Sequence, residues 1–302
     1  MQLHRLLAVL LAAALFTLAG PGSATAETVT LQHRGLTLRG ELAKAPGAEL
    51  SDGVILMLHG TLAHNRMEIM QTLQTVMQDR GYTTLAVSLG LGLDNRQGMF
   101  DCATPHTHRH EDALTELGLW MNWLEGQGVE RVALMGHSRG GNQVLWFDLE
   151  HDRPAVQAVI AIAPATWDAA ATAADYEARY GVALAEVYAR AEALHEQGKG
   201  EASLEGVGFV YCEDATVTAD AFLSYYRDDW RKDSPQVIAK LGKPVLVFAG
   251  SEDEVVKGLI PRLEGVADGQ RVRLEVIDGA DHFFRDLYAE DIGDLVDEYL
   301  AW

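Results

Sequence analysis

Short, nearly continuous hydrophobic runs alternate along this chain with longer stretches in which hydrophobic residues recur every three or four positions. The short runs are typical of parallel strands covered on both faces, and the periodic stretches are typical of amphipathic helices. The expected strands are residues 53–58, 83–89, 129–135, 156–163, 244–249 and 272–277. The expected helices are residues 66–80, 111–127, 140–149, 256–263 and 285–300. This alternation predicts an α/β fold with a doubly wound, mostly parallel sheet.

The start of the domain follows a different pattern. Residues 28–33 and 36–42 alternate polar and apolar side chains, and they flank Arg34 and Gly35. A period of two predicts half-buried strands, and a two-residue connection that contains glycine predicts a hairpin. We therefore expect an antiparallel hairpin before the first parallel strand.

Residues 165–235 interrupt the alternation, because they separate two expected core strands by far more chain than a crossover needs. The pattern predicts a helix over 168–197, a loop over 198–208 and another helix over 218–230. Ten aromatic residues lie in this segment: Trp167, Tyr176, Tyr180, Tyr188, Phe209, Tyr211, Phe222, Tyr225, Tyr226 and Trp230. We expect a cap subdomain over a pocket, and we call residues 165–235 the cap segment. A helical hairpin that only stabilises the sheet is the alternative.

Composition and charge narrow the classes of partner. The chain has 302 residues, of which 48% are hydrophobic and 23% charged, as in ordinary globular proteins. Its 24 basic and 44 acidic residues give a net charge of −20. Such a charge disfavours nucleic acid and anionic membranes as partners, so a small neutral molecule is the expected substrate. An acidic surface is also compatible with a saline habitat.

The first 26 residues have the pattern of a secretory signal peptide. A basic start is followed by an apolar run over residues 6–20, and Ala24-Thr25-Ala26 is a typical cleavage site. We expect cleavage before Glu27 and a mature domain over residues 27–302, exported to the periplasm or the exterior and free of the membrane. The alternative is a retained membrane anchor over residues 6–26.

Export changes the interpretation of the two cysteines, Cys102 and Cys212. An even number of cysteines in an oxidising compartment favours a disulfide bond. Two buried free thiols are the alternative. The strand order places Cys102 at the carboxyl edge of the sheet, where a cap would also lie, so the two residues can meet.

The sequence Gly136-His137-Ser138-Arg139-Gly140 directly follows an expected strand and precedes an expected helix. This is the context of a nucleophile elbow, a sharp turn that exposes a strained serine. Glycines are needed on both sides because the turn leaves no room for side chains. The start of the following helix adds backbone N–H groups and a positive dipole beside the serine.

With this elbow, the chain resembles the α/β-hydrolase superfamily. Three further motifs support the resemblance: His59-Gly60-Thr61, Gly250-Ser251-Glu252-Asp253 and Ala280-Asp281-His282-Phe283. The resemblance implies a catalytic triad of Ser138, Asp253 and His282, in the chain order expected for this fold. It also implies an oxyanion hole formed by the N–H groups of Thr61 and Arg139, and no cofactor or metal.

For two of these roles, the triad acid and the second oxyanion donor, neighbouring residues are alternatives. Another carboxylate could orient His282; the candidates are Glu252, Glu254, Asp278 and Asp281. Leu62 could replace Thr61 as the second oxyanion donor. His59 is expected to hold the shape of its loop and not to act as a base.

His106, His108 and His110 alternate in the stretch before residue 111. Imidazoles at a period of two share one face of an extended chain, which suggests a metal site. Solvated loop histidines are the commoner outcome, and we expect that here.

These observations favour a secreted serine hydrolase that cleaves a small or medium carboxylic ester through an acyl-enzyme. One alternative is an amidase or peptidase with the same triad, because the fold serves both reactions. The other is a catalytically silent protein that binds a ligand under the cap. The sequence leaves the natural substrate and the oligomeric state open.

Overall fold

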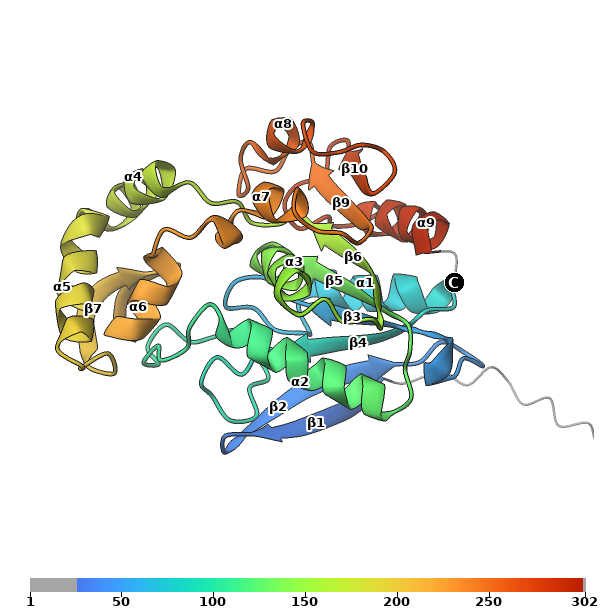
Figure 1. Cartoon of the computed structure of the whole chain (residues 1–302), viewed down its shortest axis with the longest axis horizontal. Helices are drawn as coiled ribbons and strands as arrows, with labels where there is room; N and C mark the ends of the chain where they lie inside the picture. Colours follow the sequence, from blue (N-terminus) through green and yellow to red (C-terminus); the bar gives the residue numbers. More distant parts are fainter. Residues whose placement is uncertain (1–25, 301–302) are drawn as a thin grey trace, which may run out of the picture.

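A computed structural model describes residues 26–300. Within this range an eight-stranded sheet runs in the order β1-β2-β4-β3-β5-β6-β9-β10 (Figure 1). β1 pairs antiparallel with β2, β2 pairs antiparallel with β4, and the other neighbours are parallel. The strands are β1 (Glu27–His33), β2 (Leu36–Ala43), β3 (Val54–Leu58), β4 (Thr83–Ser88), β5 (Val132–His137), β6 (Val156–Ile162), β9 (Val245–Gly250) and β10 (Val272–Ile277).

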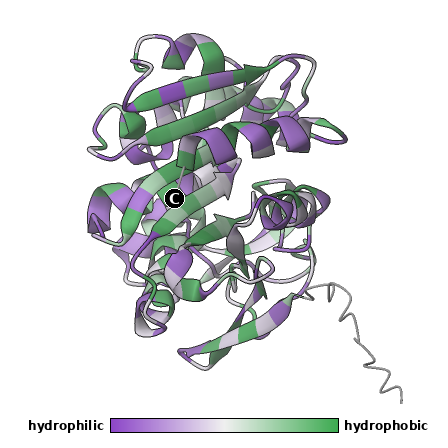
Figure 2. Ribbon diagram, turned by 90° about the vertical axis from the view of Figure 1, so that its right-hand side faces the viewer, coloured by the Kyte–Doolittle hydropathy of each residue, from purple (hydrophilic) through white to green (hydrophobic). Residues whose placement is uncertain are grey.

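Helices cover both faces of the sheet, as the sequence pattern predicts. α1 (Glu68–Asp79) and α9 (Tyr288–Leu300) lie on one face, and α2 (Asp112–Gly126) and α3 (Arg139–His151) lie on the other. Three further short helices are η1 (Leu50–Asp52), α8 (Leu259–Leu263) and α7 (Ser234–Ile238), which begins at the end of the cap segment. Figure 2 shows mainly hydrophobic colour on the central strands and a mixture of both colours on the helices.

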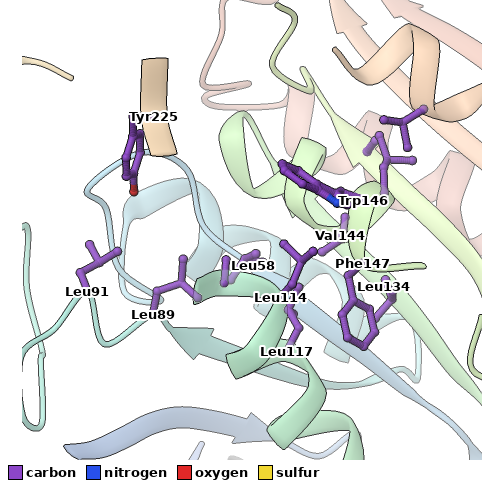
Figure 3. Close-up of a cluster of buried hydrophobic side chains, with 14 of the residues drawn as sticks. Leu58, Leu89, Leu91, Leu114, Leu117, Leu134, Val144, Trp146, Phe147 and Tyr225 are labelled. Carbon is purple, nitrogen blue, oxygen red and sulfur yellow. The ribbon is translucent and has the colours of Figure 1, made fainter. Parts of the chain in front are cut away.

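Alternate side chains of β3 enter different hydrophobic clusters. Leu56 and Leu58 pack with residues of α2 and α3, whereas Ile55 and Met57 pack with residues of α1 and α9. Successive side chains of a strand point to opposite faces, so a strand covered on both sides is apolar throughout. Figure 3 shows the first cluster, in which Tyr225 of the cap segment lies near leucines of the core. The predicted mostly parallel α/β fold is therefore confirmed.

The cap segment forms its own group of elements at one side of the main sheet (Figure 1). It contains a two-stranded antiparallel sheet that is separate from the main one. Its elements are α4 (Ala169–Tyr180), α5 (Leu184–Glu196), β7 (Ser203–Phe209), β8 (Cys212–Thr218), α6 (Ala219–Tyr226) and η2 (Trp230–Lys232).

Two details of the expected cap segment were wrong. The expected helix over 168–197 is divided between α4 and α5, because Gly181 has a positive φ of 69° and ends α4. The expected loop over 198–208 overlaps the hairpin of β7 and β8. Irregular register near Val207 and a positive φ at Gly206 break the alternation that would have identified these strands.

The predicted signal peptide lies outside the described residues except for Ala26, so export remains a prediction. No helix within residues 26–300 is long and apolar enough to cross a membrane.

Candidate active site

Ser138 lies in the turn between β5 and α3, with a positive φ of 57°. This conformation is strained for a residue with a side chain. The flanking glycines permit it: a Cβ on Gly136 would collide with the backbone of Gly140, and a Cβ on Gly140 would collide with the carbonyl group of His59. The sequence therefore forms the sharp turn expected of a nucleophile elbow.

Ser138, His282 and Asp253 form a hydrogen-bonded chain. His282 Nε2 lies 2.9 Å from Ser138 Oγ, and His282 Nδ1 lies 2.8 Å from Asp253 Oδ2. Asp253 follows β9 and His282 follows β10, so three strands bring the side chains to one edge of the sheet. All three side chains are largely shielded from solvent.

The surroundings of Asp253 favour its ionised form. Burial opposes ionisation, but hydrogen bonds from His282 and from the N–H groups of Val256 and Val255 hold the pKa of this carboxyl group below its usual range. An ionised Asp253 accepts the Nδ1 proton of His282. Nε2 is then left unprotonated and can accept the Ser138 hydroxyl proton.

The other carboxylates considered for this position have different surroundings. Asp281 accepts hydrogen bonds from Phe283 N–H and from Arg285, and Asp278 lies beside the Ser251 hydroxyl group. Glu252 and Glu254 are exposed.

The loop after β3 lies directly beside the serine. A Cβ on Gly60 would be only 3.1 Å from the Ser138 Cβ. Ala63 N–H donates to the Gly60 carbonyl group, whereas the N–H groups of Thr61, Leu62 and Arg139 donate no hydrogen bond within residues 26–300. The Arg139 side chain joins the two loops, because its Nε donates to Thr61 Oγ1 at 2.9 Å.

Two buried histidines hold the loops around the serine. His59 Nδ1 lies 2.8 Å from the Gly60 carbonyl oxygen, and its Nε2 accepts from Leu89 N–H. Burial and then the charge of Arg96 lower the pKa of His59 to about 3, so the ring is neutral. His137 Nε2 donates to the His282 carbonyl oxygen at 2.8 Å. This role of His137 was not predicted from the sequence, in which the only signal was a histidine inside the elbow motif.

Cys102 and Cys212 form the expected disulfide bond, with their Cα atoms 5.4 Å apart. The bond joins the loop after β4 to the start of β8 in the cap segment. Nearby, His106 N–H donates to the Thr216 carbonyl group, and the His106 carbonyl group accepts from Thr218 N–H. The loop is therefore attached to the cap segment by a covalent bond and by backbone pairing.

The expectation that His106, His108 and His110 are solvated was wrong, because all three are buried. His106 Nδ1 lies 3.2 Å from His108 Nε2, and His108 Nδ1 lies 2.9 Å from the Tyr225 hydroxyl group. The stretch runs between the core and the cap segment, a placement that depends on distant parts of the chain. No group of ligands suited to a metal ion occurs in the described part of the chain.

Comparison with known proteins identifies the protein family to which this chain belongs. The model of the alpha/beta hydrolase family matches residues 55–295. The chain therefore belongs to the alpha/beta hydrolase family, as its motifs had suggested. A search of curated proteins found no match.

Three solved structures illustrate the similarity of fold. Est1E from Butyrivibrio proteoclasticus is 16% identical, with a TM-score of 0.63 over 91% of this chain and 97% of that one. A monoacylglycerol lipase from Paleococcus ferrophilus is 17% identical, with a TM-score of 0.59 over 87% of this chain and 98% of that one. The esterase domain of a Rhodothermus marinus protein is 18% identical, with a TM-score of 0.58 over 91% and 97%.

Proposed function

We propose that this protein is a serine hydrolase that cleaves carboxylic esters by double displacement. Ser138 attacks the ester carbonyl carbon while His282 Nε2 accepts its proton, and the alcohol leaves with that proton. Water then attacks the acyl-enzyme, with His282 again as base, and releases the acid. Asp253 holds the imidazole in the required tautomer. The observation that carries the proposal is the hydrogen-bonded chain from Ser138 through His282 to Asp253.

The proposed oxyanion hole consists of the backbone N–H groups of Thr61 and Arg139. Both N–H groups lack an acceptor within residues 26–300, and the loop of Thr61 approaches the serine closely at Gly60. Arg139 is also the first residue of α3, whose N-terminal dipole favours negative charge. Each donor to a tetrahedral oxyanion is typically worth about 3 to 4 kcal/mol of transition-state stabilisation.

We propose an ester and not an amide as the substrate, and the titles of similar structures support this choice. Their titles include an esterase domain and a monoacylglycerol lipase, and one Est1E structure contains ferulic acid. The fold alone does not distinguish these reactions, since the same triad can cleave amides.

A fluorophosphonate probe tests the proposed nucleophile. The probe should label wild-type protein at Ser138 and leave Ser138→Ala unlabelled, as shown by mass spectrometry of the modified peptide. A panel of para-nitrophenyl esters and para-nitroanilides of increasing acyl length should show turnover of esters. Turnover of anilides alone would identify an amidase, and absence of labelling would support a silent binding protein.

We further propose that the chain is exported and that the cap segment covers the active site. Support for export comes from the N-terminal pattern together with the disulfide bond, since such bonds persist in oxidising compartments. Mass spectrometry of protein exported by its native route should find Glu27 at the N-terminus and both thiols oxidised. A retained N-terminus would support the membrane-anchor alternative.

A further inference from the structure

Arg139 carries a positive charge without a carboxylate partner beside the proposed nucleophile. The residue is half-buried, and it forms no ion pair within residues 26–300. Its Nε donates to the Thr61 hydroxyl group, one terminal nitrogen lies 3.2 Å from His110 Nδ1, and its guanidinium carbon lies 5.2 Å from the centre of the Tyr225 ring. Burial, followed by the charge of Arg139, keeps the pKa of His110 well below its usual value. The contacts of Arg139 are therefore all uncharged.

A second cation lies nearby, at the end of the cap segment. Lys232 is only 3% exposed, and its ammonium group donates to the carbonyl oxygens of Tyr225 at 3.1 Å and Arg227 at 2.7 Å. It also lies 4.7 Å from the centre of the Trp167 ring. No carboxylate of residues 26–300 forms an ion pair with Lys232. Burial lowers its pKa to about 7, and the positive charge of Arg139 contributes to this lowering, so the two cations influence each other.

The acidic residues around this pair of cations have other partners. Glu111, which favours the charged form of Lys232, accepts a hydrogen bond from the Ser224 hydroxyl group. Asp229 pairs with Arg231 at 2.6 Å. Neither carboxylate forms an ion pair with Arg139 or Lys232, so Arg139 has no direct counter-ion, although the whole chain has a net charge of −20.

Other shielded cations of the chain have either a carboxylate or backbone carbonyl oxygens as partners. The buried Arg96 forms no ion pair but donates to the carbonyl oxygens of Leu89 and Gly98, whereas the Arg139 side chain donates to no carbonyl oxygen within residues 26–300. Lys243 pairs with the buried Asp148 at 2.8 Å, and Arg262 pairs with the buried Asp233. A shielded charge without a counter-ion is costly, and functional sites are where proteins retain such arrangements. A guanidinium group also matches the two oxygens of a carboxylate. These observations indicate that the missing anion belongs to a ligand.

We propose that Arg139, with Lys232 near it, binds a carboxylate of the substrate, so that the preferred substrate is an ester that carries a negative charge. The inference rests on the proposed esterase function, because it places the carboxylate close to the ester bond that Ser138 attacks. The net charge of the chain had favoured a neutral substrate. The proposal favours an anionic one instead, because Arg139, the residue after Ser138, is a cation with uncharged contacts only.

Two matched pairs of esters test the proposal on either side of the ester bond. On the acyl side, mono-para-nitrophenyl glutarate is compared with para-nitrophenyl pentanoate, which has a methyl group in place of the carboxylate. On the alcohol side, the butanoate ester of para-hydroxybenzoate is compared with that of para-cresol. We expect kcat/KM to be at least about tenfold higher for the anionic member of one pair, the size typical of charge-assisted hydrogen bonds.

Variants connect this preference to the side chain. Arg139→Gln should reduce the anionic-to-neutral ratio at least about tenfold, and Arg139→Lys should retain part of the preference. The ratio is compared within each variant, so a general loss of activity cancels. Arg231→Gln is the matched control, because it removes the same charge from a neighbouring residue that is already paired with Asp229 and Glu150. A ratio of one or less for wild type in both pairs, or a preference that survives Arg139→Gln, would overturn the proposal.

Binding without turnover separates this inference from the esterase proposal. Calorimetry with monomethyl glutarate should show binding to Ser138→Ala, about tenfold weaker binding when Arg139→Gln is added, and no weakening when Arg231→Gln is added. Unfolding midpoints and the Arg139→Lys variant control for misfolding. Failure of wild type to hydrolyse any ester would reject the esterase proposal, whereas Arg139-independent binding would reject the anion site.

Discussion

Two regions of the molecule differ in how far apart their residues lie along the chain. One is the edge of the main sheet that carries Ser138. The other is the junction, where residues 102–110 contact the cap segment. At the sheet edge, Ser138, Asp253 and His282 each follow a buried strand within a few residues. At the junction, the disulfide bond joins residues 110 positions apart. The residues of the proposed triad are thus specified by local turns, whereas the contacts between the core and the cap segment are specified by long-range packing.

The two regions also differ in how their polar groups are stabilised. At the sheet edge, Asp253 is ionised and accepts hydrogen bonds from His282 and from backbone N–H groups. At the junction, His106 and His108 are buried, and burial keeps both rings neutral at neutral pH. Substitutions at the sheet edge should therefore affect turnover most, and changes at the junction should affect stability and selectivity.

The largest effect is expected at the nucleophile. Ser138→Ala should lower kcat by about 10⁵-fold or more, because the other triad members cannot act without the attacking oxygen. The unfolding midpoint should stay close to that of wild type, since the hydroxyl group bonds only to the His282 ring within the described residues. Steady-state kinetics and thermal unfolding measure the two quantities. Near-normal turnover with an unchanged midpoint would reject Ser138 as the nucleophile.

The next largest effect is expected from the carboxylate. Asp253→Asn should lower kcat by about 10⁴-fold, because an amide can donate to Nδ1 and favour the wrong tautomer of His282. Glu252→Gln is the matched control, since it removes an adjacent but exposed carboxylate. Equal losses in both variants would contradict the assignment of Asp253.

Local periodicity was sufficient to predict most of the fold. Strands such as β3 and β5 are buried on both faces, so they are apolar throughout and easily recognised. The hairpin of β7 and β8 was not recognised, because irregular register and glycine disrupt the period of two. Helix ends such as Gly181 depend on a single backbone conformation, which an averaged pattern does not show.

In the candidate site, too, the residues specified by local sequence were predicted and those that depend on distant contacts were not. Ser138, Asp253 and His282 were named from motifs at strand ends, and the structure brings these three side chains into contact. Lys232 and the burial of His106 were not anticipated, because each depends on contacts between the core and the cap segment. Their environments cannot be read from neighbouring residues.

Removal of the disulfide bond tests the junction directly. Cys102→Ser combined with Cys212→Ser should lower the free energy of unfolding by up to about 4 to 5 kcal/mol, because the bond closes a long loop in the unfolded chain. Hydrolysis of a small neutral ester should persist, since the triad residues are attached to the core strands. Discrimination among acyl lengths should decrease. Chemical denaturation with and without reductant provides the measurement, and unchanged stability would contradict a tethering role.

The smallest expected effect is the loss of folding stability at acidic pH that the buried histidines cause. Burial lowers the pKa of His106 to about 4 and that of His108 to about 3, below the ordinary value of 6.5. Above this ordinary value both the folded and the unfolded chain hold neutral rings, and the full stability is present. As pH falls from there toward the folded-state values, only the unfolded chain takes up these protons, so stability decreases.

For His108 alone the loss should reach about 2 kcal/mol between about pH 7 and about pH 5. His108→Gln should therefore reduce the pH dependence of unfolding by that amount, although it lowers stability at neutral pH through the lost contact with Tyr225. His151→Gln is the control, because it removes an exposed histidine. Urea unfolding at several pH values gives the slopes. Equal slopes for His108→Gln and wild type would show that this ring remains accessible to protons in the folded protein, and the contrast between a locally built sheet edge and a neutral, buried junction would then not hold.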